Sequence, residues 1–265
     1  MAVARAAVSL GITKIRVTGG EPLIRKGVVK LVRELNALDG LETVALTTNG
    51  VRLAKYASVL KAAGLRRVNV SLDSLVPDTY RAITRGGDVE EVVGGIDEAI
   101  RAGLSVKINA VLFEGMNTDE IEGFVAFARR RGIAVRFIER MSFVLNKPFV
   151  SETAVVEWLR RTHTVTRVED AEGSPHVRLY DCDGVRVGFI SPRSHAFCAG
   201  CNKLRLTPKG ELRACLASRV SVNIKGVLRN EHSDADLLEA IREAVRIKPA
   251  EGPWTSPLEM WRVGG

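Results

Sequence analysis

Residues 15–23 read Ile-Arg-Val-Thr-Gly-Gly-Glu-Pro-Leu, a short apolar strand that runs into a glycine turn before a helical pattern begins. Two adjacent glycines let the backbone approach a ligand closely, and Glu21 places a carboxylate beside them. Alone, such a turn is equally compatible with a plain strand-to-helix corner. The segments on either side of it therefore decide the fold and the chemistry.

The same strand–helix unit repeats between residues 13 and 141. Short runs rich in Val, Ile and Leu predict buried parallel strands at Lys14–Thr18, Thr43–Thr47, Arg67–Leu72, Val106–Leu112 and Ala134–Glu139. Amphipathic segments predict helices at Val28–Leu38, Leu53–Ala63, Val89–Ala102 and Asp119–Arg131. Asn117 and Glu120 form the pattern of a capping box before the last of these. The repeat predicts a β/α fold, either a barrel-like curve or a doubly wound sheet, with ligands at the carboxyl ends of the strands.

The second half of the chain does not continue the strand–helix repeat. Helices are predicted at Ser151–His163, which opens with a capping serine, and at Ala235–Ile247. Short strands are predicted between them at Val177–Tyr180, Val185–Ile190, Leu204–Thr207 and Leu212–Cys215. We therefore expect a β/α unit over residues 1–145 and a small C-terminal α+β module over residues 146–265.

The composition limits the class of protein. With 39 Lys and Arg against 31 Asp and Glu, the chain carries a formal net charge of +8, which suits phosphate-bearing small ligands or nucleic acid. Aromatic residues make up only 5% and do not alternate with the cations, which argues against a surface on which bases stack. No run of residues reads as a membrane span. We expect a cytoplasmic protein, because four cysteines, three of them clustered, fit a reducing compartment better than a disulfide framework.

Three of the cysteines form the pattern Cys198-x2-Cys201-x13-Cys215. Three thiolates are one ligand short of a structural zinc site, whereas a cubane iron–sulfur cluster held by three thiolates keeps one iron open. Cys182 or His195 would be the fourth ligand of a zinc site. We favour a buried or surface thiol for Cys182 and an ordinary loop position for His195.

Cations accompany the cysteines and two of the strands. Lys203 and Arg205 follow Cys201 directly, where they can hold an anionic ligand beside a metal centre. Lys107 and Arg136 stand among apolar residues on predicted strands, and because a buried unpaired cation is costly, a ligand explains them better than packing does. The remaining histidines are isolated and are assigned to the surface or to caps: His163, His176 and His232.

The glycine turn at residues 18–22 matches the motif with which radical S-adenosylmethionine (SAM) enzymes hold the amino group of their cofactor. The next two strands end in Thr47-Thr48-Asn49-Gly50 and Ser71-Leu72-Asp73-Ser74-Leu75, as in that superfamily. With the cysteine segment and the terminal Gly264-Gly265, the chain resembles the MoaA family of GTP 3′,8-cyclases of molybdenum-cofactor biosynthesis over nearly its whole length. The resemblance implies an incomplete radical SAM (β/α) barrel that lacks its first strand, covered by a C-terminal module with a second iron–sulfur site.

The resemblance also implies a reaction and its residues. The family uses SAM and radical chemistry to rearrange GTP to 3′,8-cyclo-7,8-dihydro-GTP, a lyase step. The ligands of the auxiliary [4Fe–4S] cluster would be Cys198, Cys201 and Cys215. The SAM contacts would be Gly19, Gly20, Glu21, Ser71 and Met141. The GTP contacts would be Arg16, Thr47, Lys107, Arg136, Lys203, Arg205, Gly264 and Gly265.

One part of the family pattern has no counterpart. The radical-generating [4Fe–4S] cluster is held by Cys-x3-Cys-x2-Cys, and no cysteine precedes Cys182. We expect a shortened sequence that is inactive without that cluster. Two alternatives stay open: a non-catalytic paralogue that binds an iron–sulfur cluster or zinc and a nucleotide, and a peptide-modifying radical SAM maturase.

The implied partners follow from the same resemblance. They are GTP, an electron donor and the next molybdopterin-pathway enzyme, and a homodimer is compatible with it; no nucleic acid or membrane is expected. Lys203 stands where the family usually has Arg, so a bidentate fork is replaced by a point charge.

Overall fold

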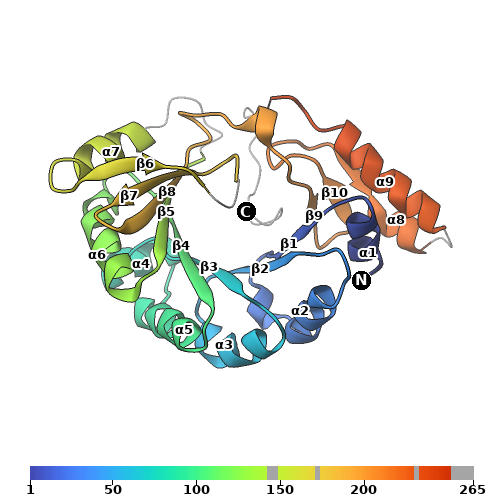
Figure 1. Ribbon diagram of the computed structural model, residues 1–265, viewed down its shortest axis with the longest axis horizontal. Coiled ribbons are helices and arrows are strands. Elements are labelled where there is room, and N and C mark those ends of the chain that lie inside the picture. The colour runs from blue at the N-terminus through green and yellow to red at the C-terminus, as the bar shows by residue number, and fades with distance from the viewer. Residues whose placement is uncertain (142–148, 171–173, 230–232, 252–265) are drawn as a thin grey trace.

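The computed structural model describes residues 1–141, 149–170, 174–229 and 233–251. Its main feature is an eight-stranded sheet in the order β1-β2-β3-β4-β5-β8-β7-β6, which curves into an arc (Figure 1). The strands are β1 Lys14–Val17, β2 Thr43–Thr48, β3 Arg67–Ser71, β4 Ser105–Leu112, β5 Ala134–Glu139, β6 Val165–Val168, β7 Arg178–Cys182 and β8 Val185–Ile190. Strands β1 to β5 and β8 are parallel, whereas β7 and β6 are antiparallel to their neighbours.

Helices cover the convex side of the arc (Figure 1). They are α2 Val28–Asn36, α3 Leu53–Ala62, α4 Pro77–Thr84, α5 Val89–Arg101, α6 Ile121–Arg131 and α7 Glu152–Leu159, with 3-10 turns η1 Pro22–Ile24 and η2 Thr118–Glu120. Among the described helices, none combines the length and the apolar character that a membrane crossing requires. The five strands and four helices predicted for the first half are confirmed to within a few residues.

The strands alternate between two environments. On β4, Val106 and Ile108 are buried against the helices, while Lys107 and Asn109 are only partly buried on the concave side. On β5, Val135 and Phe137 belong to the same core. Each fully buried Leu, Ile or Phe stabilises the fold by about 1.5–3 kcal/mol, so the apolar face fixes which side chains point inward. The polar residues left on the concave side have no such packing role.

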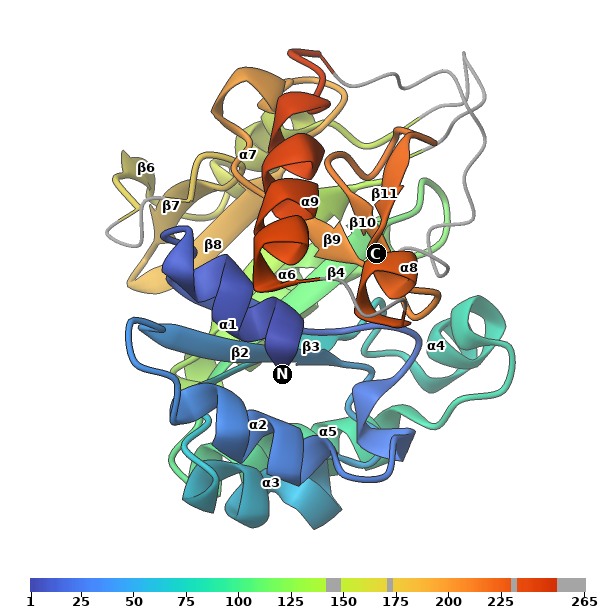
Figure 2. The same cartoon turned by 90° about the vertical axis from the view of Figure 1, so that its right-hand side faces the viewer.

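A second, three-stranded sheet in the order β11-β10-β9 lies across the open side of the arc. Its parts are β9 Arg205–Leu206, β10 Glu211–Arg213 and β11 Ser221–Asn223, with α8 Ile224–Arg229 and α9 Asp234–Arg246 behind them. The first helix, α1 (Ala2–Ser9), packs against α9 (Figure 2). Both ends of the described chain therefore meet in one small apolar cluster around Leu212, Ile224 and Ile241.

The organisation of the second half differs from the prediction. We expected residues 177–190 to form part of a separate cap, but β8 pairs with β5 and β7 pairs with β8, so the barrel sheet continues past residue 145. The short elements α4, β6, β11 and α8 were missed. The helix α4 has eight residues, of which only Tyr80 is buried, so its apolar pattern is too short to predict a helix.

The predicted capping box at Asn117 is also wrong. Its side chain makes no capping hydrogen bond; instead Nδ2 donates to the carbonyls of Asp73 and Val111. The Glu120 carboxylate accepts from the Ser74 hydroxyl and from the N–H of Leu75. Both side chains thus hold the loop after β3. They form these hydrogen bonds to distant residues in place of the local hydrogen bonds of a capping box.

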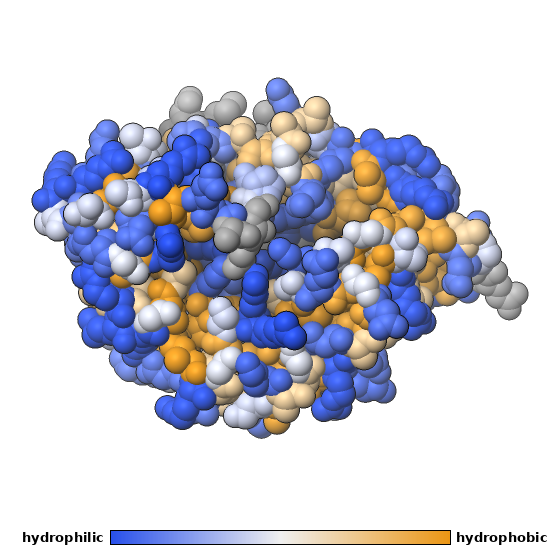
Figure 3. Space-filling view, in the orientation of Figure 1, coloured by the Kyte–Doolittle hydropathy of each residue, from blue (hydrophilic) through white to orange (hydrophobic). Residues whose placement is uncertain are grey.

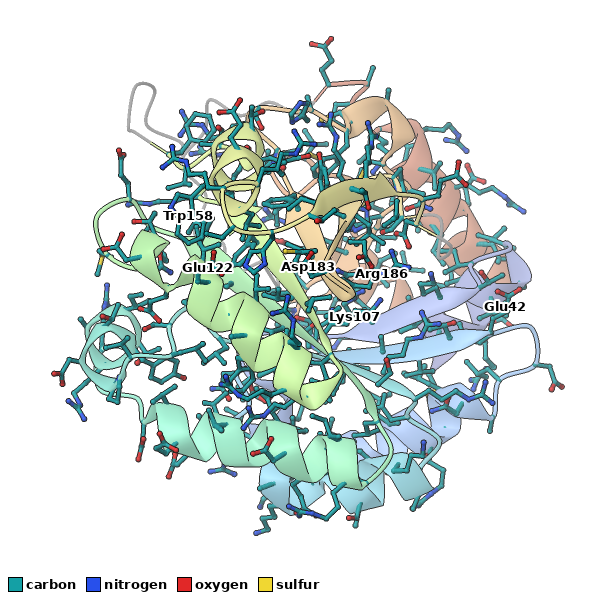
Figure 4. The ribbon with its side chains drawn as sticks, turned by 60° about the vertical axis from the view of Figure 1, so that its left-hand side comes forward. Glu42, Lys107, Glu122, Trp158, Asp183 and Arg186 are labelled. Carbon is teal, nitrogen blue, oxygen red and sulfur yellow. The ribbon has the colours of Figure 1, made fainter. Side chains whose placement is uncertain are left out.

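His163 connects α6 with the turn between β7 and β8. Its Nε2 lies 2.7 Å from the Glu122 carboxylate and its Nδ1 lies 2.8 Å from the Asp183 carboxylate; both acids are labelled in Figure 4. The hydrogen bond with Glu122, followed by the one with Asp183, raises the pKa of His163. The isolated position predicted for His163 is therefore wrong.

This arrangement predicts a pH-dependent stability. Because the folded-state pKa of His163 is raised, the protonated imidazole stabilises the fold below the unfolded pKa of about 6.5, and the contribution is lost as the pH rises through the folded pKa. His163→Gln is expected to lower the melting temperature near pH 6 by about 2–4 °C, the shift that roughly 1 kcal/mol produces in a chain of this size. The deficit should shrink toward pH 9. Thermal unfolding followed by circular dichroism measures it, and a deficit equal at both pH values would contradict the ionic pairing.

Candidate functional site

The inward-facing residues of the parallel strands form rows across the concave face of the sheet. One row contains Thr47 on β2, Asn69 on β3 and Lys107 on β4. The next row contains Ser71 on β3, Asn109 on β4, Arg136 on β5 and Gly188 on β8. Residues predicted for SAM and residues predicted for GTP therefore share one face of the sheet.

Arg136 depends on a gap in the neighbouring strand. Its side chain is 6% exposed, and it lies in register with Gly188. A Cβ atom at position 188 would lie 2.9 Å from Cγ of Arg136, closer than such atoms approach each other. Glycine at 188 therefore makes the room in which the arginine stem lies.

Four cations from distant parts of the chain meet here: Arg16, Arg136, Lys203 and Arg205, called the cationic cluster below. Burial, then the charges of Arg205 and Arg16, lower the pKa of Lys203 to about 7; Cys201 opposes this and Arg136 adds to it. Burial also lowers the pKa of Arg205. Nη1 of Arg16 lies 3.5 Å from Oγ1 of Thr47, which joins β2 to the same group. Positive charges held together in a partly buried site repel one another, and an anionic ligand would relieve that repulsion.

His176 belongs to the same place, so the isolated position predicted for it is wrong. Its ring centroid lies 5.8 Å from that of Phe197, and its Nε2 lies 3.1 Å from the Ser174 hydroxyl. Burial, then the charges of the cationic cluster with Lys203 first, lower the pKa of His176 to about 3. The imidazole is therefore neutral at physiological pH. It also lines a cavity of about 150 Å³ together with Arg178 and His195.

The three cysteines lie beside the cationic cluster. Cys198 opens the 3-10 turn η3 (Cys198–Gly200), and the N–H of Cys201 donates to the Cys198 carbonyl at 3.0 Å. Cys215 follows β10 after one residue. The thiols are partly buried, and in the described part of the chain they form no disulfide. The charges of Cys201 and Cys215 both raise the pKa of Arg205, which indicates that these two thiols lie near its guanidinium.

This donor set fits an iron–sulfur cluster better than a single ion. Within the described residues, no three or more His, Cys, Asp or Glu side chains are arranged around one ion position. A cubane distributes its three thiolates over three irons, so they need not converge on one point. Cys182 is fully buried on β7, where burial raises the pKa of its thiol to about 11, and His195 lies 3.5 Å from the buried Glu152 carboxylate. The side chains considered for a fourth zinc ligand are thus placed elsewhere.

The glycine turn after β1 is held by Glu21. One carboxylate oxygen accepts from the Thr48 hydroxyl at 2.8 Å and from the N–H of Leu23, and the other accepts from the N–H of Asn49. Gly19 has a φ of 134°, and a Cβ atom on Gly19 or Gly20 would enter open space. The turn therefore fits a backbone contact with SAM, while the Glu21 side chain fixes its shape. Of the other predicted SAM contacts, Ser71 is exposed at the end of β3 and Met141 follows β5.

Two amides on the concave face were missed in the sequence. Nδ2 of Asn69 and Oδ1 of Asn109 are buried and make no hydrogen bond to any described residue. The sequence contained a sign of them, because both point to the same face of the sheet as Lys107: Asn69 pairs with it and Asn109 lies two residues after it.

Gly264 and Gly265 lie outside the described residues. Figure 3 shows hydrophilic side chains gathered along the middle of this face, between the arc and the smaller sheet.

Comparison with known proteins agrees with this geometry. Residues 1–128 match the family model described as "Radical SAM superfamily", and residues 133–254 match "Molybdenum Cofactor Synthesis C". The GTP 3′,8-cyclase 1 of Pseudomonas aeruginosa is 43% identical over 97% of this chain and 81% of that protein. The GTP 3′,8-cyclase of Moorella thermoacetica is 44% identical over 99% of this chain and 85% of that protein.

The fold of solved structures is similar as well. Streptococcus suis SuiB bound to S-adenosylmethionine has a TM-score of 0.57 at 16% identity, covering 91% of this chain and 59% of that one. At such low identity the likeness concerns the fold alone. The two family models and the identity to the curated cyclases show that this chain belongs to the GTP 3′,8-cyclase family of the radical SAM superfamily.

Proposed function

We infer that this protein serves the GTP 3′,8-cyclase step of molybdopterin biosynthesis, the rearrangement of GTP to 3′,8-cyclo-7,8-dihydro-GTP. The observation that carries the proposal is that the cationic cluster lies beside Cys201 and Cys215, two of the three cysteines. A triphosphate carries the negative charge that suits four cations held this close together. The relatives that bear the cyclase name, at 43–44% identity, support the same substrate.

Separate groups of the described residues would bind the phosphates, the auxiliary cluster and SAM. Arg16, Arg136, Lys203 and Arg205 bind and orient the phosphates, and the neutral His176 can donate or accept one hydrogen bond beside them. When bound by Cys198, Cys201 and Cys215, a [4Fe–4S] cluster supplies an open iron that acts as a Lewis acid toward the purine. The Gly19-Gly20 backbone, Ser71 and Met141 would hold SAM, the source of the radical chemistry. Fixed placement matters most, because a radical reacts with whatever lies nearest.

The four cysteines of the sequence contain no Cys-x3-Cys-x2-Cys pattern. We therefore expect these 265 residues by themselves to bind the auxiliary cluster and GTP without converting GTP. Conversion requires that second set of ligands and an electron donor. The four thiols suit a cytoplasmic, reducing setting.

Metal analysis and ligand titration test the proposal. After anaerobic reconstitution, we expect about four irons with matching sulfide per chain, and a cluster spectrum that changes on addition of GTP. GTP should bind more tightly than guanosine, and this difference should shrink with added salt because it depends on phosphate–cation contacts. Stoichiometric zinc without sulfide and no response to GTP would overturn the proposal in favour of a non-catalytic zinc module. Equal affinity for GTP and guanosine would overturn the role of the cationic cluster.

A further inference from the structure

Lys248, just after α9, reaches across to the cysteine-bearing segment. Its Nζ donates a hydrogen bond to the carbonyl oxygen of Lys203 at 2.9 Å and another to the carbonyl oxygen of Ala214 at 2.7 Å. Lys203 is two residues from Cys201, and Ala214 directly precedes Cys215. One ammonium group thus joins the two backbone stretches that carry these cysteines.

The position of this contact in the small sheet explains why it is needed. Strands β9 and β10 pair at Leu206 with Leu212 and at Arg205 with Arg213, and the strand pairing ends there. Beyond that pair the two stretches lead to Cys201 and Cys215. The carbonyls of Lys203 and Ala214 then accept from the lysine rather than continuing the ladder. Lys248 therefore closes the open end of the hairpin at the point where the ligands leave it.

The lysine is well placed to do this. Lys248 is partly buried, and Ala214 is 2% exposed, so its carbonyl has little access to water. A charged donor makes a stronger hydrogen bond than a neutral one, and a buried carbonyl left without its donor is costly. Lys248 also follows α9, whose Leu237 and Ile241 pack into the apolar cluster behind β10. Lys248 is thus attached to a helix that is itself packed in the core of the small module.

We propose that Lys248 is a positioning residue for the auxiliary cluster: it fixes the spacing of Cys201 and Cys215 through the backbone and places a positive charge next to them. The proposal rests on the assignment of these cysteines as cluster ligands. Groups that orient metal ligands from outside typically change metal affinity by about 10–100-fold when they are removed. A fixed cation close to the cluster also favours its more negative, reduced form.

The test compares Lys248→Met with Lys61→Met. Methionine keeps much of the lysine stem but removes the donors. Lys61 is the matched control, because its Nζ also donates to a backbone carbonyl, that of Gly103, on the helical side of the arc. In cluster-loaded protein, K248M is expected to lose iron to a chelator at about tenfold lower concentration than the unchanged chain, whereas K61M should behave like the unchanged chain. K248M should also lower the reduction potential of the remaining cluster, and Lys248→Arg should restore both properties in part.

Thermal unfolding of the cluster-free chains separates positioning from general stability. We expect K248M to unfold at a somewhat lower temperature than K61M, because the buried carbonyl of Ala214 loses its donor, and we expect its loss of iron to exceed what that difference in stability explains. Iron retention and potential in K248M equal to those of the unchanged chain would overturn the proposal. An equal loss of iron in K61M would also overturn it. So would a loss of iron in K248M no larger than its lower stability without the cluster explains. Failure of the unchanged chain to bind iron would instead overturn the cluster assignment itself.

Discussion

Arg136→Met is expected to weaken GTP binding by about 100-fold, equivalent to roughly 2.7 kcal/mol. Arg136 is 6% exposed on β5, and its charge lowers the pKa of both Lys203 and His176, so it belongs to the cationic cluster that we propose binds the triphosphate. Charged hydrogen bonds in such a partly buried site are strong, and methionine fills much of the same volume without any donor. Isothermal titration of the cluster-loaded protein with GTP measures the loss.

Arg186→Met is the matched control for this change. Arg186 lies on the adjacent strand β8, but its side chain is 54% exposed and lies 3.7 Å from Asp181; Figure 4 labels it. We expect its loss to leave GTP affinity within about twofold, as exposed ion pairs contribute little. An equal loss in both variants would indicate a long-range charge effect and would contradict a direct contact of Arg136 with GTP.

Gly188→Ala tests the placement of Arg136 without altering any charge. The added Cβ atom would lie 2.9 Å from Cγ of Arg136, so the arginine has to move. We expect GTP affinity to fall about tenfold, less than in R136M because the charge remains in the site. An unchanged affinity in G188A would mean that the charge of Arg136 matters but its exact placement does not.

The strands and helices of the first half were predictable because their signals are local. Apolar residues alternate with other residues along these strands, as Val106 and Ile108 do on β4 and Val135 and Phe137 do on β5. This alternation predicts the buried face of each strand from its own sequence. Lys107 and Arg136 became candidates for ligand contacts because they stand among these apolar residues, where a cation without a partner is costly. The sequence of a strand does not show which other strand it pairs with, so the pairing of β8 with β5 was not predicted.

The residues that were misread take part in contacts between distant segments. His163 meets Glu122 and Asp183 across 41 and 20 positions, and Asn117 bonds to the carbonyl of Asp73 across 44. A single histidine or asparagine carries no periodicity, so only the fold shows what surrounds it. For His176 the missing information was the burial and the four cations that keep it neutral.

Cys215→Ser is expected to reduce the bound iron from about four atoms per chain to less than one. A cluster on three thiolates has no spare protein ligand, and a serine hydroxyl is a poor substitute for a soft thiolate. Cys182→Ala is the matched control, since Cys182 is a buried core thiol whose raised pKa disfavours the thiolate that binds metal. We expect C182A to retain the full iron content, with only a modest loss of stability.

The effect of C215S on GTP should differ in kind from that of R136M. The charges of Cys201 and Cys215 partly offset the burial of Arg205, so removing one thiolate and the cluster leaves the cationic cluster more positive. Affinity for inorganic triphosphate should therefore be kept or increased in C215S. If the open iron of the cluster holds the purine, as proposed, the preference for GTP over triphosphate should disappear. In R136M the opposite holds: triphosphate binding falls and the response of the cluster to guanosine remains. Parallel titrations of both variants with the two ligands measure this, and a C215S chain that keeps its preference for GTP would show that the purine is held by protein side chains and not by the cluster.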